Sequence, residues 1–208
     1  MELYQEISER VDQGMPVKTI VAKYAWNDLS AVAQAELLKE AEKRNKASED
    51  PRPLLRTLYA MAARKDLWAA LRVLAVSYHT IKGDKTGILD TMYKILEQIR
   101  SSLRRREEAD RYLRYLAEYH VLKAHTEVDA GNIDGAIGSY QEALASYEKA
   151  RGQSEPSIAD RIAAVQRDLA HLRAIQSRDQ YLLPSNELEN RLLALMREPE
   201  AMNLIAGG

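Results

Sequence analysis

The 208-residue sequence contains no cysteine. This absence excludes a disulfide framework, an iron–sulfur cluster, a thiolate zinc site and a cysteine nucleophile. Phenylalanine is also absent, whereas tyrosine occurs 11 times, so aromatic packing depends mainly on rings whose hydroxyl groups need a partner or water. No stretch approaches about 18 uninterrupted apolar residues, and the first residues do not resemble a signal peptide. We therefore expect a soluble, cytoplasmic protein that does not bind a membrane.

The charges nearly cancel, with 30 Lys and Arg against 31 Asp and Glu. Such a chain is not a polycation that would coat nucleic acid without specificity. His120 and His125 are five residues apart, which places them on different faces of a helix, and no His-Glu-x-x-His pattern or glycine-rich phosphate loop occurs. We expect no metal, no cofactor and no enzymatic activity.

Glycine (9 residues) and proline (6 residues) are scarce, and apolar residues recur three and four positions apart along the chain. This pattern predicts an all-α protein of about ten helices, separated where the rare glycine and proline residues occur. The expected helices are Leu3–Asp12, one starting at Pro16, one capped by Asn27 and running to about Lys46, Leu54–Arg64, Asp66–Lys82, Thr86–Arg104, Glu107–Ala130, Ile133–Ala150, Ile158–Leu182 and one capped by Asn186.

The polar stretch 47–53 is the best candidate for a boundary or hinge. We therefore divide the chain into an N-terminal helical segment (1–46), a helical array with a long capping helix (54–183) and a C-terminal helix with a tail (184–208). The capping helix carries one apolar stripe that must be buried. The stripe comprises Ile162, Val165, Leu169, Leu172 and Ile175.

The C-terminal helix follows Pro184 and has apolar residues on more than one stripe. These residues are Leu188, Leu192, Leu193, Leu195 and Met196. The helix can fold back on its own chain or dock on a second copy, and a two-fold homodimer is the commonest closed assembly. The sequence leaves both alternatives open.

The segment Gly131–Leu144 carries the most structural information. Gly131 can adopt the left-handed conformation that ends one helix, and Asn132 or Asp134 can accept hydrogen bonds from the amides that begin the next. The residues that follow therefore start a second helix, packed close to the first.

Small residues in that second helix allow the two helix axes to approach, because Ala136 and Ala143 lie on the face toward the first helix and Tyr140 fills the space between them. At these positions the segment resembles the turn and second helix of a tetratricopeptide repeat. The stretch Asp66–Leu74 is similar to the same motif. The resemblance implies antiparallel helix pairs, stacked as a short array, that present a concave surface to an extended peptide or a partner helix. The alternative is an irregular helical bundle.

Arginine and tyrosine are concentrated in and around the start of the predicted 107–130 helix. A guanidinium group binds a carboxylate or phosphate through two parallel hydrogen bonds, so this cluster is a candidate site for an anionic partner. In the alternative interpretation, nearby carboxylates neutralise the charge and the segment is a solvated helix junction. The candidate residues here are Arg104, Arg105, Arg111, Arg114, Tyr112, Tyr115 and Tyr119.

Within this cluster the stretch Arg114–Glu118 is similar to part of the 14-3-3 phosphopeptide-binding proteins, in which an Arg and a Tyr hold the phosphate. Lys65 and Arg72 have the seven-residue spacing of that family's earlier basic pair, two turns apart on one helix face. The resemblance implies that they join the anion site, although the rest of the family's pattern is missing.

Two functions follow from these patterns. The leading hypothesis is a non-catalytic adaptor that binds a protein or peptide partner. The alternative is a transcriptional regulator, because Thr19–Tyr24 with Val32 is similar to a helix-turn-helix, while the repeat region would act as sensor or dimeriser. Residues 1–46 contain 7 Lys and Arg against 8 Asp and Glu, however, so they lack the positive face that phosphate binding requires. We do not expect nucleic acid to be the partner.

Overall fold

The computed structural model of the protein describes residues 3–150 and 156–181, and within them the regular structure is entirely helical. The expectation of an all-α protein of about ten helices is confirmed, and the helix predicted from Asn186 lies outside the described residues. The elements are α1 (Leu3–Asp12), α2 (Val17–Lys23), the short 3₁₀ helix η1 (Trp26–Asp28), α3 (Ala31–Lys46), α4 (Arg52–Ala63), α5 (Leu67–Thr80), α6 (Thr86–Ser102), α7 (Arg106–Asp129), α8 (Ile133–Lys149) and α9 (Pro156–Tyr181).

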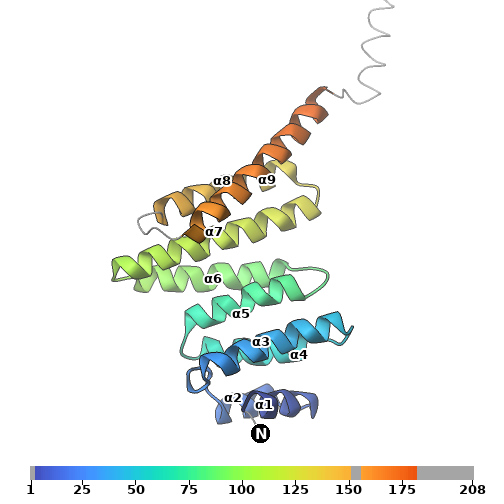
Figure 1. Ribbon diagram of the computed structural model, residues 1–208, viewed down its shortest axis with the longest axis vertical. Coiled ribbons are helices and arrows are strands. Elements are labelled where there is room, and N and C mark those ends of the chain that lie inside the picture. Colours follow the sequence, from blue (N-terminus) through green and yellow to red (C-terminus); the bar gives the residue numbers. More distant parts are fainter. Residues whose placement is uncertain (1–2, 151–155, 182–208) are drawn as a thin grey trace, which may run out of the picture.

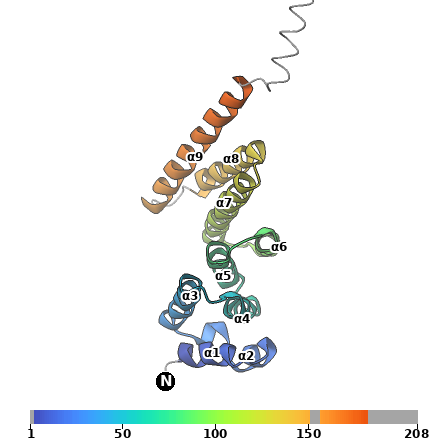
Figure 2. The ribbon, with the colours of Figure 1, turned by 90° about the vertical axis from the view of Figure 1, so that its right-hand side faces the viewer.

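The helices stack in layers along the long axis of the molecule, with α1 and α2 at one end and α9 at the other (Figure 1). From α4 onward, each helix packs against the next. The short connections make these neighbours antiparallel, as the sequence predicts. Figure 2 shows α4 and α6 toward the same side of the stack, with α5 between them.

The first three helices share a hydrophobic core with the helices that follow. One cluster of buried side chains extends from Ile7 in α1 to Leu122 in α7. Arg44 of α3 is buried and donates two hydrogen bonds to the Asp12 carboxylate, at 2.7 Å and 3.0 Å, which joins α3 to the end of α1. The candidate hinge at 47–53 lies between α3 and α4, but α4 already begins at Arg52.

The prediction that Asn27 caps the third helix is wrong. Asn27 lies in η1, and α3 begins only at Ala31, where the hydroxyl of the capping residue Ser30 accepts a hydrogen bond from the amide of Ala33 at 3.2 Å. The reason is burial of the neighbouring indole, since only 3% of Trp26 is exposed. Packing this large ring into the core bends the chain before the helix can start.

The turn between α7 and α8 has the predicted geometry. Gly131 has a φ of 74°, and the Asn132 side chain accepts a hydrogen bond from the amide of Gly135 at 3.1 Å. The Asn132 cap fills the space that a Cβ on residue 135 would need, which explains the glycine there. Both local predictions are confirmed, while the tetratricopeptide resemblance itself stays a prediction.

The contact between α7 and α8 is the most extensive in the described residues. Four alanines that are fully buried, two from each helix, belong to one cluster: Ala117, Ala124, Ala136 and Ala143. One polar pair also crosses this interface, because the Ser139 hydroxyl of α8 donates a hydrogen bond to Glu127 of α7 at 2.6 Å.

The apolar stripe of α9 covers α7 and α8, as predicted. Ile162, Val165, Leu169 and Leu172 are all buried in the cluster formed with α7 and α8, and Ile175 packs against it. The stripe therefore closes this end of the array, where the outer face would otherwise expose apolar surface.

The alanine packing gives a first test. Ala136→Trp places an indole where the exposed fraction is 0%, so we expect it to lower the free energy of unfolding by about 3 kcal/mol or more. Gly138→Ala, two residues away in α8, is the control. An added Cβ there meets no atom within 4 Å, so it should raise the free energy of unfolding by about 0.5–1 kcal/mol. Urea unfolding measures both, and equal stability of the two variants would contradict the packing described.

We expect the protein to become less stable in acid because of two histidines on α7. Burial is the main cause that lowers the pKa of both His120 and His125 below the usual 6.5. The folded protein then binds these protons less readily than the unfolded chain, so the free energy of unfolding falls as the pH drops below about 6.5. The double variant His120→Gln/His125→Gln should lose most of this dependence between about pH 8 and about pH 5.5, measured by urea unfolding. An unchanged slope would contradict the assignment.

Candidate functional site

A pocket of about 310 Å³ lies where α7, α8 and α9 meet. It is open to the surface, and arginine is its commonest residue. The lining residues are Arg111, Arg114, Tyr115, Glu118, Tyr147, Ile158 and Arg161. We refer to it as the arginine pocket. Among the described residues, the lining therefore brings together three guanidinium groups and one carboxylate.

Arg111 is held over two aromatic rings. Its guanidinium lies 4.6 Å from the centre of the Trp68 ring and 5.9 Å from that of Tyr115. These two rings are themselves in contact, with centroids 5.7 Å apart. A guanidinium stacked on a ring is held in place by cation–π attraction while its N–H groups point sideways, where they can reach an acceptor. Arg111 has no ion pair with a carboxylate in the described part of the chain.

Arg161 enters the pocket from α9. Its guanidinium lies 4.0 Å from the Glu118 carboxylate of α7, and it lies close enough to the Tyr147 hydroxyl of α8 for the two groups to influence each other's pKa. Burial raises the pKa of Tyr147 above its usual value, and the nearby Arg161 guanidinium acts in the opposite direction. At neutral pH the phenol is therefore a neutral hydroxyl that can donate or accept a hydrogen bond.

The pocket has the chemistry of a site for an oxyanion. The paired N–H donors of a guanidinium group match two oxygens of a carboxylate or phosphate, and the tyrosines add hydroxyl groups on rigid rings. The ion pair with Glu118 is half-exposed on the arginine side, and such pairs are worth only about 0–1 kcal/mol. An incoming anion can therefore compete for Arg161 at little cost.

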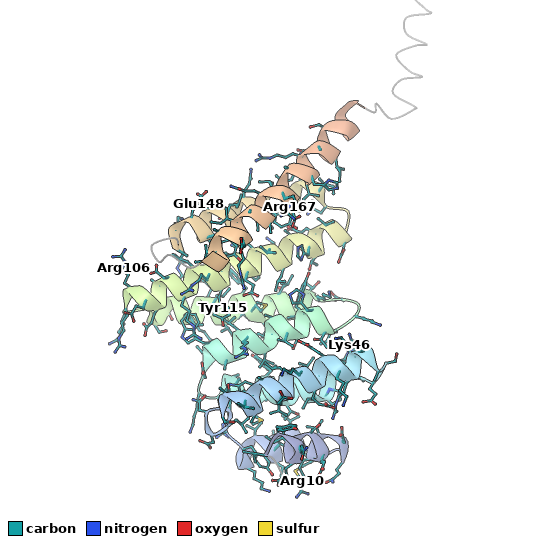
Figure 3. All side chains as sticks on the ribbon, viewed as in Figure 1. Arg10, Lys46, Arg106, Tyr115, Glu148 and Arg167 are labelled. Carbon is teal, nitrogen blue, oxygen red and sulfur yellow. The ribbon has the colours of Figure 1, made fainter. Side chains whose placement is uncertain are left out.

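Only three of the predicted site residues in the cluster line this pocket, namely Arg111, Arg114 and Tyr115. Figure 3 shows Tyr115 toward the inside of the stack, whereas Arg106, at the start of α7, points away from it. Arg104 and Arg105 lie in the exposed connection before α7, where their backbone amides donate to Glu108 at 3.3 Å and 3.4 Å.

Tyr112 and Tyr119 face α6 instead. Tyr112 is buried, and Tyr119 packs against Tyr93 of α6 with ring centroids 5.7 Å apart. Burial raises the pKa of both phenols. The two tyrosines are seven residues apart on one side of α7, and they contribute to packing between helices rather than to the pocket.

Lys65 and Arg72 are not two turns apart on one helix, so this sequence-based expectation is wrong. Lys65 lies in the turn between α4 and α5, because Asp66 caps α5 by accepting a hydrogen bond from the amide of Ala69 at 3.0 Å. Lys65 lines a different pocket, near Trp26, and Arg72 is exposed on α5 outside the arginine pocket.

Trp68, Tyr147 and Arg161 are among the residues of the pocket region that the sequence did not predict. They come from α5, α8 and α9, so only the packing of distant segments brings them to α7. One sequence signal was available for Arg161, since it precedes Ile162 in the stripe that was predicted to cover the array.

Other kinds of site find no support in the described ranges. No group of three or more His, Asp or Glu residues could hold a metal ion there, and none of the described helices is both long and apolar enough to cross a membrane. Compared with protein families, with curated proteins and with solved structures, the chain gives no match.

The pair of Tyr147 and Arg161 gives a test of the pocket geometry. We expect Arg161→Gln to raise the pKa of Tyr147 further, because the positive partner that favours phenolate is lost. The measurement is ultraviolet titration of phenolate, with the Tyr147→Phe variant subtracted to isolate this residue. A fall in the pKa, or no change, would show that Arg161 does not contact the phenol.

Proposed function

We propose that the protein is a non-catalytic adaptor that binds a partner protein, and that the arginine pocket receives an oxyanion side chain from a segment of that partner. The observation that carries this proposal is the convergence of Arg111, Arg114 and Arg161 on one open pocket. The oxyanion is a carboxylate or a phosphate, which share the two-oxygen geometry that arginine recognises.

The size and position of the pocket support a segment of a partner rather than an enclosed metabolite. A volume of about 310 Å³ is at the lower end for ligand pockets. The pocket is also open to the surface, so a chain can pass across it and insert one side chain. The resemblance of Gly131–Leu144 to a tetratricopeptide repeat supports the same function, since that fold presents a surface to a peptide.

The charges of residues 1–46 favour a protein partner over nucleic acid. Five of the seven cationic residues there lie within 4.0 Å of a carboxylate, so little positive charge is left for phosphate contacts. The five are Arg10, Lys23, Lys39, Lys43 and Arg44. Trp26 is buried in the core at the position where a helix-turn-helix needs its sharp turn.

Binding of fluorescein-labelled acidic peptides tests the proposal. Three peptides differ only in the central residue, which is phosphoserine, glutamate or serine. We expect the phosphoserine or the glutamate peptide to bind, with an affinity that falls as salt is added, and the serine peptide to bind at least about tenfold more weakly. A comparison of the affinities of the phosphoserine and glutamate peptides shows which oxyanion the pocket prefers.

Two single-charge variants with opposite expected effects provide the matched comparison. Arg161→Gln should weaken peptide binding about tenfold because a charge-assisted hydrogen bond is lost. Glu118→Gln should strengthen it, since the competing carboxylate is removed. Arg167→Gln, on the same helix but outside the pocket (Figure 3), serves as control and should leave the affinity unchanged. Equal weakening by Arg161→Gln and Arg167→Gln would contradict the proposal.

A further inference from the structure

A second pocket, of about 230 Å³, lies where α2, η1 and the end of α4 meet. Its charged lining residues in the described part of the chain are Lys23, Arg64 and Lys65 with one carboxylate, Asp28. We refer to it as the α2–α4 pocket. Lys23 is already paired, because its ammonium group lies 2.9 Å from the Glu6 carboxylate. The two cations that remain for a ligand are Arg64 and Lys65.

Arg64 is held in place by the backbone of α2. Its guanidinium donates a hydrogen bond to the carbonyl oxygen of Val21 at 2.6 Å. The other N–H groups of this exposed side chain have no hydrogen-bond partner within the described residues. Because the bond to Val21 fixes the head group, these donors are positioned before a ligand arrives.

Lys65 adds a second cation beside Arg64. It is exposed and forms no ion pair with a carboxylate of residues 3–150 or 156–181. The neighbouring Asp66 carboxylate caps α5 by accepting a hydrogen bond from the amide of Ala69. An ammonium group on a flexible stem can reach an anion from several directions, so it complements the fixed guanidinium of Arg64.

Trp68 connects this pocket to the arginine pocket. It follows Lys65 by three residues and is only partly buried. On its ring lies Arg111 of the arginine pocket, with the guanidinium 4.6 Å from the ring centre. The turn between α4 and α5 also lies on the same side of the stack as the starts of α7 and α9 (Figure 1). The two pockets therefore belong to one side of the molecule, with the Trp68 indole between them.

The separation of the two pockets suits an extended chain. Lys65 and Trp68 are one turn apart, about 5–6 Å, and the Arg111 guanidinium lies 4.6 Å beyond the indole. Including the side-chain lengths, the two sites are on the order of 15 Å apart. An extended chain covers this distance in about four to six residues.

We propose that the partner segment carries two acidic side chains, four to six residues apart, and that the second one binds Arg64 and Lys65 in the α2–α4 pocket. The segment crosses Trp68 between the two contacts. This inference rests on the proposed function, since the first acidic side chain occupies the arginine pocket. Once the first is bound, binding of the second is intramolecular and therefore strengthens the complex.

A set of peptides with equal charge tests the spacing. Each fluorescein-labelled peptide keeps the preferred oxyanion residue at its centre and carries one added glutamate. The glutamate stands four, five or six residues from the centre, before it in one series and after it in the other. In the control peptide the glutamate is adjacent to the centre and cannot reach the second pocket. We expect one of the spaced peptides to bind at least about threefold more tightly than the control.

Lys65→Gln tests which residue causes the difference. It should reduce the affinity of the spaced peptide to that of the control peptide and leave the control peptide unaffected. Arg64 is kept, because it also holds the Val21 carbonyl. Lys46→Gln, at the opposite side of the stack (Figure 3), removes the same charge outside both pockets and should change neither affinity.

The variant Arg161→Gln separates the two proposals. If it weakens all the peptides while Lys65→Gln acts equally on spaced and control peptides, or on neither, the second contact is wrong and the adaptor function stands. Equal affinity of every spaced peptide and the control would overturn the second contact as well. If Arg161→Gln has no effect on any peptide, the proposed function fails and the second contact fails with it.

Discussion

The close packing of α7 against α6 and α8 determines how the other helices of the array are arranged. α7 is the longest helix between α1 and α8, with 24 residues, and it contacts α6 on one side and α8 on another. Fully buried alanines on α7 and α8 hold these two helices together. The buried Tyr78 hydroxyl of α5 donates to the backbone oxygen of Leu122 at 2.8 Å, which fixes α7 on the preceding layer as well. α9 can cover the array only because α7 and α8 already form one surface.

The sequence predicted the local elements well, because the residues that determine where a helix begins or ends lie within a few positions of that point. The φ of 74° at Gly131 and the cap at Asn132 follow from residue type and position alone. Where the prediction was wrong, a tertiary contact decided the outcome. The amide side chain of Asn27 is a good helix cap in isolation, but burial of Trp26 delays the helix until Ser30.

The site was predicted only in part, for a geometric reason. Residues that are close together in the sequence point to different sides of a helix. Tyr112 and Tyr119 therefore face α6, while Arg111 and Tyr115 face the arginine pocket. Composition cannot separate these faces before the neighbours of the helix are known. Tyr147 and Arg161 come from helices that follow in the chain, and no spacing rule links them to α7.

The proposed function requires arginines from two separate helices, α7 and α9, to bind one ligand. The most direct measurement is an NMR titration of the arginine Nε–Hε signals with the preferred acidic peptide. We expect the signals of Arg111 and Arg161 to shift together with a single midpoint. The signal of Arg44, which is buried and already paired with Asp12, should stay in place. Separate midpoints for Arg111 and Arg161, or shifts at Arg104 and Arg105 alone, would contradict it.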